Sequence, residues 1–147
     1  MKEVLDDNFC FVCGRENPIG LRLSFDLDLP ARTVSTVFRP RHFHQGWKNR
    51  LHGGILSAVL DEAMVNAAYL LDMPAVTAEM SIRFRAPADT RQLLNIHGTI
   101  TEIRTKFLKA AAECRTTDGT CVAEASALLI RADPGAGKHR HIVIHPA

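Results

Sequence analysis

A histidine followed by two glycines, His52-Gly53-Gly54, opens the stretch that most constrains this chain. From there to Leu71 nearly every residue is apolar or small, and large apolar residues recur at three- and four-residue steps, which predicts a helix over residues 53–71. The only charges in it are Asp61 and Glu62. Two carboxylates in a largely buried helix cost free energy unless something uses them, so we expect a functional site there.

The composition predicts one soluble globular domain. The chain has 147 residues, of which 46% are hydrophobic and 23% charged, enough to form a core. A net charge of +2 without a basic stripe argues against a nucleic-acid partner. The two carboxylates interrupt the longest apolar segment, so we expect no membrane span. Residues 1–7 are charged and lack the apolar region of a secretory signal, which makes cytoplasmic residence the default expectation.

Strand-like alternation fills most of the remaining sequence. The segment 21–28 alternates leucine or phenylalanine with polar residues, the period of a half-buried strand. Five further strands are predicted over residues 33–38, 75–85, 93–104, 106–116 and 120–131. Asp118-Gly119 is typical of a hairpin turn between the last two. This order predicts an α+β fold in which an antiparallel sheet of about six strands wraps around one long central helix.

Other segments carry weaker signals. We expect a single domain over residues 1–131, with residues 1–20 as an irregular lead-in and residues 132–147 as a flexible or accessory tail. Residues 39–51 are predicted to be a loop. In the strand 75–85, strict alternation predicts one face formed by Ala78, Met80, Ile82 and Phe84.

The histidine and double glycine, with Asp61 nine residues after His52, resemble the hotdog-fold acyl-CoA thioesterases in this order of elements. The PaaI-type and 4-hydroxybenzoyl-CoA group is the most similar, over residues 9–131. Further matching segments are Cys10-Phe11-Val12-Cys13-Gly14, Asn17-Pro18-Ile19-Gly20-Leu21, Gln45-Gly46-Trp47 and residues 79–87. The resemblance implies hydrolysis of an acyl- or aryl-CoA without a cofactor, by a homodimer or homotetramer whose active sites lie between subunits.

Thioester hydrolysis needs a polarised carbonyl and an activated water or a nucleophile. Unpaired N–H groups at a helix start can polarise the carbonyl, and glycines allow close approach. By resemblance, the N–H of Gly54, next to Gly53, holds the carbonyl oxygen. Asp61 is the expected catalytic carboxylate, either as a general base or as a nucleophile that forms an anhydride. Glu62, about 100° away around the helix, is its rival and is placed among the substrate-contacting residues.

Two further residues are candidates for the catalytic group. His52 is expected to bind the carbonyl oxygen or shape the pocket, with a local loop cap as the equal alternative. In related enzymes a serine or threonine at the start of the strand after the helix comes from the neighbouring subunit and orients the water. Thr77 matches that position, with simple β-propensity as the alternative.

Substrate contacts are expected from aromatic and basic residues. Trp47 is a candidate for the acyl pocket, as are Val59 and Met64, for which core packing is the favoured interpretation. Basic side chains should hold the phosphates of coenzyme A. Arg83 and Arg85 are the first candidates, ahead of Lys48, Arg50, Arg104 and Lys106.

The four cysteines fall into two pairs. Cys10-x-x-Cys13 supplies half of the ligands of a zinc site. The other ligands would come from His42 and His44, or from His139, His141 and His145. Two reduced thiols packed at the edge of the fold is the favoured alternative, and no catalytic metal is expected. Cys114 and Cys121 flank the predicted hairpin turn, and we expect free thiols there too.

Two other functions share this fold class. A hydroxyacyl-thioester dehydratase or enoyl hydratase would carry a catalytic histidine in a His-Phe-Pro-type loop or an Asp-x4-His motif. His42-Phe43-His44 resembles the first of these only weakly. A non-catalytic acyl-CoA-binding protein would need an added partner-binding segment. Hydration without thiol release would favour the first, and binding without turnover the second.

Overall fold

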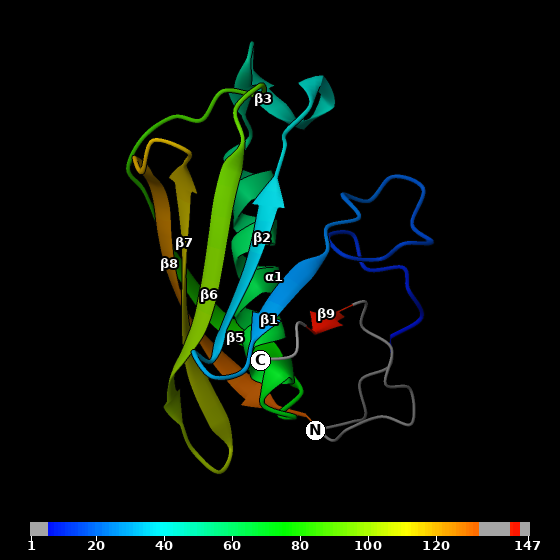
Figure 1. Cartoon of the computed structure of the whole chain (residues 1–147), viewed down its shortest axis with the longest axis vertical. Helices are drawn as coiled ribbons and strands as arrows, with labels where there is room; N and C mark the ends of the chain where they lie inside the picture. Colours follow the sequence, from blue (N-terminus) through cyan, green and yellow to red (C-terminus); the bar gives the residue numbers. More distant parts are fainter. Residues whose placement is uncertain (1–5, 133–141, 145–147) are drawn as a thin grey trace.

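A single long helix lies along one face of a curved antiparallel sheet in the computed structural model, which describes residues 6–132 and 142–144 (Figure 1). The sheet order is β5-β8-β7-β6-β2-β1-β9. Its members are β1 (Phe25–Asp28), β2 (Thr33–Phe38), β5 (Ala75–Phe84), β6 (Leu94–Ile103), β7 (Phe107–Thr116), β8 (Cys121–Arg131) and β9 (Ile142–Ile144). The helix, α1, spans Gly53–Leu70. The predicted fold class is confirmed.

The six longer strands pair with one another only in antiparallel fashion, as predicted. A seventh, β9, comes from the predicted tail and pairs in parallel with β1, Phe25 opposite Ile142. Residues 133–141 and 145–147, which include His139, His141 and His145, lie outside the described residues. The predicted strand at residue 21 begins only at Phe25, because Leu21 and Leu23 donate their N–H groups to Phe11 and Val12 of the lead-in instead.

The core lies between α1 and the concave face of the sheet. Val59, Leu60 and Met64 of the helix are fully buried, which confirms the core interpretation of Val59 and Met64. Gly98 of β6 allows this close packing, since a Cβ there would lie 2.7 Å from the backbone oxygen of Ala63. The helix therefore contacts the sheet with almost no space between the two backbones.

The predicted loop 39–51 contains regular structure that alternation did not reveal. A 3-10 turn, η1 (His42–His44), leads into a small hairpin of β3 (Gln45–Trp47) and β4 (Arg50–Leu51), at the top of Figure 1. His44 is buried, and its carbonyl accepts the N–H of His52 at 2.8 Å. This contact fixes where the chain enters α1.

A β-bulge interrupts β5. Thr77 pairs with Leu129 and Glu79 with Leu128, so Ala78 is an extra residue without a partner in β8. Before the bulge Ala75 is buried, and after it Met80 and Ile82 pack against the core. The predicted shared face is correct for Met80, Ile82 and Phe84, which follow one another in unbroken register, but wrong for Ala78, the extra residue at the bulge. A single inserted residue changes which side chains face inward.

Within the described residues, no helix has the length and apolar character needed to cross a membrane.

Candidate active site

The start of α1 is organised by His52. Its backbone is extended, and its Nδ1 accepts the N–H of Gly54 at 2.8 Å, which makes it the N-cap of the helix. Because Nδ1 is the acceptor, the proton of the neutral ring lies on Nε2, which is then a donor. The local-cap interpretation of His52 is confirmed, and the N–H of Gly54 that was expected to meet a carbonyl already has a partner.

A pocket of about 350 Å³ opens beside this helix end. Gly53, Phe84 and Arg85 are among its lining residues. A Cβ on Gly53 would lie 3.3 Å from the Phe84 ring, so the absent side chain keeps this corner of the pocket open. Arg85 forms an ion pair with Glu124 of β8, at 2.7 Å, with both side chains about half exposed. The pocket thus combines helix N-terminal dipoles, an aromatic wall and a cation.

Asp61 and Thr77 meet across the helix and the sheet. The Thr77 hydroxyl donates to Asp61 Oδ1 at 2.5 Å, and both residues are half-buried. Thr77 lies just before the bulge of β5, where its side chain faces α1. The resemblance implied a residue of the neighbouring subunit at this point. In the structure, the threonine that contacts Asp61 belongs to the same chain.

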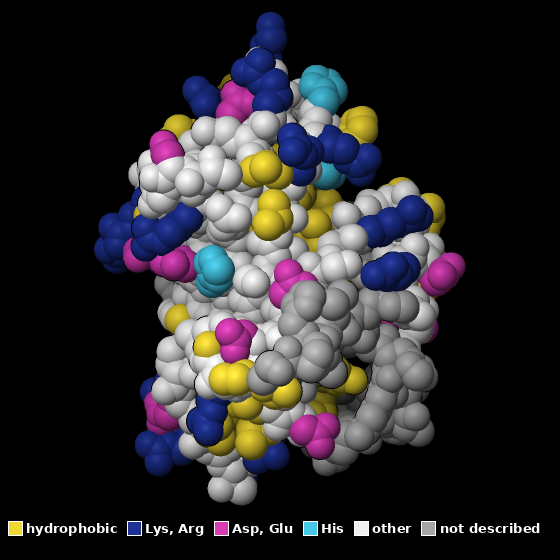
Figure 2. All heavy atoms as spheres, viewed as in Figure 1, with side chains coloured by type: hydrophobic (Ala, Val, Ile, Leu, Met, Phe, Trp, Pro, Cys, Tyr) yellow, Lys and Arg dark blue, Asp and Glu magenta, His cyan; other side chains and the backbone are white. Residues whose placement is uncertain are grey.

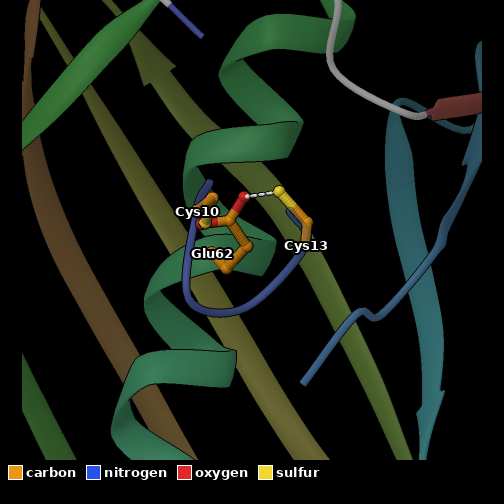
Figure 3. A group of neighbouring side chains, drawn as sticks. All are labelled: Cys10, Cys13 and Glu62. Atoms are coloured by element: carbon orange, nitrogen blue, oxygen red, sulfur yellow. Dashed lines mark hydrogen bonds between the residues drawn. The ribbon is translucent and has the colours of Figure 1, made fainter. Parts of the chain in front are cut away.

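Glu62 faces the N-terminal lead-in (Figure 3). Cys13 Sγ donates to Glu62 Oε1 at 3.0 Å, and Cys10 Sγ lies 3.5 Å from Oε2. The hydrogen bond with Cys13 holds the pKa of Cys10 at about 7, while the same hydrogen bond and burial raise the pKa of Cys13. Among the described residues, neither His42 nor His44 belongs to this group. The residue beside the two thiols is therefore a carboxylate rather than His42 or His44, while His139, His141 and His145 lie outside the described residues.

The remaining candidates are spread over the surface. Trp47, on the β3–β4 hairpin, is 84% exposed and does not line the pocket at Gly53. Arg83 is exposed on β5. Figure 2 shows Lys and Arg side chains gathered at the end that carries β3, where Lys48 and Arg50 are exposed. Helix α1 starts at this end.

Two other predicted phosphate contacts lie at the opposite end of the sheet. Arg104 and Lys106 form the turn between β6 and β7, and Arg104 pairs with Glu102 at 2.7 Å. Cys114 and Cys121 are free thiols, as expected, and burial raises the pKa of Cys114 to about 12.

A family model described as the thioesterase superfamily matches residues 48–123, just over half of the chain. The chain belongs to the thioesterase superfamily. The match runs from the β3–β4 hairpin through α1 to the start of β8, and so includes His52, Asp61 and Thr77. No curated protein matches this superfamily member significantly.

Solved structures confirm the hotdog fold of this superfamily member. One thioesterase superfamily protein has a TM-score of 0.79 at 22% identity, covering 88% of this chain and 68% of its own. A hypothetical thioesterase from Streptococcus pneumoniae, solved with coenzyme A, has a TM-score of 0.68 at 16% identity, covering 71% and 81%. The E. coli PaaI protein from the phenylacetic acid degradation operon has a TM-score of 0.67 at 16% identity, covering 76% and 77%.

Two groups of site residues lay beyond the sequence reasoning. Phe84 lies on the predicted face with Met80 and Ile82, but at the end of β5 this face lines the pocket at the helix start, a role that the alternation did not indicate. An exposed aromatic at the end of an edge strand was the available signal. The contact between Glu62 and the cysteine pair joins residues about fifty positions apart, and no local pattern indicates it.

Proposed function

We propose that this protein is an acyl-CoA thioesterase in which Asp61 is the catalytic carboxylate. The observation that carries the proposal is the hydrogen bond from Thr77 to Asp61. It holds one carboxylate oxygen in a fixed position on a helix more than half of whose residues are buried. A carboxylate oriented in this way can take a proton from water or attack a thioester carbon itself.

The proposed reaction is hydrolysis of the C–S bond. As general base, Asp61 takes a proton from water while the water oxygen attacks the thioester carbonyl carbon. The negative charge that develops on the carbonyl oxygen is stabilised by the start of α1, through the helix dipole at Gly53 and the Nε2–H donor of His52. The C–S bond then breaks, and the coenzyme A thiolate takes up the proton from Asp61. In the alternative route the Asp61 carboxylate attacks the carbonyl carbon, the C–S bond breaks, and coenzyme A leaves as its thiolate. Water then hydrolyses the mixed anhydride to the free acid and the Asp61 carboxyl group, whose proton goes to the thiolate.

Spacing along α1 supports active sites shared between two copies. Gly54 and Asp61 are seven residues apart, which is roughly 10 Å along the axis and nearly two full turns, so both face the same side of the helix. Reacting groups must approach to about 3–3.5 Å. A carbonyl held at the start of α1, by Gly53 and His52, is therefore beyond the reach of Asp61 in the same chain. A second copy whose α1 runs antiparallel to this helix would bring its own Asp61 to that carbonyl. By two-fold symmetry the dimer would then contain two such sites.

The free edge of the sheet supports the same arrangement. In the described part of the sheet, β5 has only β8 as a neighbour, and its ten residues present an open edge. Phe84 at its end is 52% exposed. Native proteins seldom leave a long edge with an exposed aromatic uncovered. We propose a homodimer that pairs or covers β5, which would also enclose the pocket beside Gly53.

The relatives support both the substrate and the residues. The S. pneumoniae protein was solved with coenzyme A. Two further structures of it carry alanine in place of an aspartate and of a threonine sixteen positions apart. Asp61 and Thr77 are sixteen positions apart and hydrogen-bonded here. We therefore propose a coenzyme A thioester as the substrate, with phosphates at the basic end near Lys48 and Arg50 and with Arg83 and Arg85 as further candidates.

We expect the purified protein to release free thiol from at least one member of a panel of acetyl-, hexanoyl-, palmitoyl-, phenylacetyl- and hydroxybenzoyl-CoA. Thiol release is measured with a chromogenic disulfide, and crotonyl-CoA hydration is followed in parallel. The reason is that hydrolysis frees the coenzyme A sulfur, whereas hydration leaves the thioester intact. Hydration without thiol release would contradict the thioesterase and favour the hydratase, and binding without either would favour a non-catalytic protein.

A mixture of two inactive variants should regain activity if the sites are shared. In heterodimers of Asp61→Asn with Gly54→Val, one site carries both changes and the other carries neither. After mixing under exchange conditions, about a quarter of all sites would be intact in a random population of two-fold dimers. Thiol release at about that fraction of the wild-type rate is expected. A mixture as inactive as its parents, despite subunit exchange verified by mass spectrometry of intact dimers, would place the whole site within one chain.

A further inference from the structure

We propose that Cys10, Cys13 and Glu62 form a zinc site that ties the N-terminal lead-in to the middle of α1. Each residue offers one ligand atom, and the three atoms lie within 4.8 Å of one another. Figure 3 shows the side chains converging from the loop and the helix. The proposal does not depend on thioesterase activity.

The distances suit a tetrahedral ion. Zinc binds thiolate sulfur at about 2.3 Å and carboxylate oxygen at about 2.0–2.2 Å, which separates its ligands from one another by roughly 3.5–3.8 Å. Glu62 Oε1 lies 3.0 Å from Cys13 Sγ, and Oε2 lies 3.5 Å from Cys10 Sγ. The ligand atoms lie within 4.8 Å of one another, so movements of about 1 Å or less would bring them to the separations of a tetrahedral site.

The loop that carries the cysteines is wound tightly around them. Val12 directs its N–H to Cys10 Sγ at 3.4 Å, and Gly14 closes a turn onto the carbonyl of Cys10 at 2.9 Å. A Cβ on Gly14 would lie 2.4 Å from the carbonyl oxygen of Asn8, so only glycine fits. A backbone N–H that points at sulfur stabilises a thiolate, the form that binds metal. The local backbone is thus arranged to present two sulfurs to one point.

A neighbouring side chain of α1 orients the third ligand, Glu62. Asn66, one turn further along α1 and 1% exposed, donates its amide N–H to Glu62 Oε1 at 3.2 Å. Outer contacts of this kind orient ligands at metal sites. Glu62 is itself buried, with 8% of its surface exposed.

The donor set selects the metal. Two thiolates and one carboxylate suit zinc, which accepts both soft and hard ligands, whereas magnesium and calcium require oxygen alone. Three protein ligands leave a fourth tetrahedral position. Cys10 is the partly exposed member, so water reaches the site from its side and takes that position.

The test uses the full chain without a histidine tag, reduced and stripped with a chelator, then titrated with Zn²⁺ and separately with Co²⁺. We expect one equivalent of zinc per chain by elemental analysis after gel filtration. Bound cobalt should show the thiolate charge-transfer band and the intense visible bands of a tetrahedral site. Zinc should also raise the melting temperature, because the metal binds the folded state only.

Matched variants assign the ligands. Cys10→Ser/Cys13→Ser and, separately, Glu62→Gln should weaken zinc binding at least about a hundredfold, since even the partners of ligands contribute up to about that factor. Cys114→Ser/Cys121→Ser is the control, because that pair also has one buried and one partly exposed thiol. It should bind zinc and cobalt as the wild type does.

Three results would overturn the proposal. The first is a wild-type chain that holds no stoichiometric zinc at micromolar free metal, a result that needs no variant to fold. The second is equal loss of binding in the control pair. The third is full retention in Glu62→Gln, which would remove the carboxylate from the site. Thiol release from acyl-CoA is measured separately, so failure of the zinc site leaves the proposed activity standing.

Discussion

Asp61→Asn is expected to lower thiol release from the best acyl-CoA at least about a hundredfold, the scale typical of losing a general base or nucleophile. Asparagine keeps the shape of the side chain and can still accept the hydroxyl of Thr77, which now donates to Asp61 at 2.5 Å. It has no negative charge with which to take a proton or attack carbon. We expect kcat to fall with KM nearly unchanged, measured by continuous thiol detection.

The matched control is Asp72→Asn, an exposed residue in the turn that follows the end of the same helix. Asp72 has a φ of 57°, a conformation that asparagine tolerates well. This variant should keep the wild-type rate. A second pair of variants tests the hydrogen bond from Thr77 to Asp61. Thr77→Ser retains the hydroxyl and should stay active, while Thr77→Val removes the hydroxyl. An Asp61→Asn enzyme with unchanged kcat would return this residue to a structural role.

Gly98→Val is expected to destabilise the fold by about 3 kcal/mol, the upper end of the usual overpacking cost. A Cβ at this position would meet the Ala63 carbonyl oxygen at 2.7 Å and the Ala63 Cβ at 3.1 Å. Since the clash is with helix backbone, α1 must move away from β6. Valine has the better β-propensity, worth at most about 1 kcal/mol, so the clash dominates. The melting temperature should fall by roughly 10 °C in a domain of this size, by calorimetry or circular dichroism.

His97→Val separates the clash from the change in propensity. His97 precedes Gly98 in β6 and is exposed on the other face, so the same valine there meets no helix. It should leave the melting temperature within a few degrees of the wild type. If Gly98→Val proved as stable as His97→Val, the helix and the sheet would have more space between them than the structure shows.

Elements with strong periodicity could be predicted from the sequence. The helix was expected over residues 53–71 and spans Gly53–Leu70, and β2 has the predicted bounds, because apolar spacing determines which face is buried. The β3–β4 hairpin was missed, since strands of two or three residues are too short to show alternation. The bulge in β5 was missed because an extra residue at Ala78 looks in the sequence like any exposed alanine.

The site residues also fall into those that a local sequence pattern indicated and those that only the three-dimensional structure revealed. His52, Gly53 and Asp61 stood out because their local spacing is unusual for a buried helix. Thr77 was found by resemblance, and its contact within the same chain needed the three-dimensional register. Glu62 was assigned to the substrate because sequence gives only its angle around α1, not the loop that packs against that face. That substrate assignment stays a prediction.

The bulge at Ala78 has a consequence for comparing this chain with its relatives. Before the bulge the odd-numbered residues of β5, such as Thr77, face the helix. After it the even-numbered residues, such as Met80 and Ile82, face the core. A relative without the extra residue could keep its core residues in register only by displacing its threonine. It could keep the threonine in place only by displacing the core residues. An alignment without a gap would then pair the threonine with a residue on the wrong face. Sequence comparison across this strand is therefore reliable only after superposition, even where both chains contain every residue of the site.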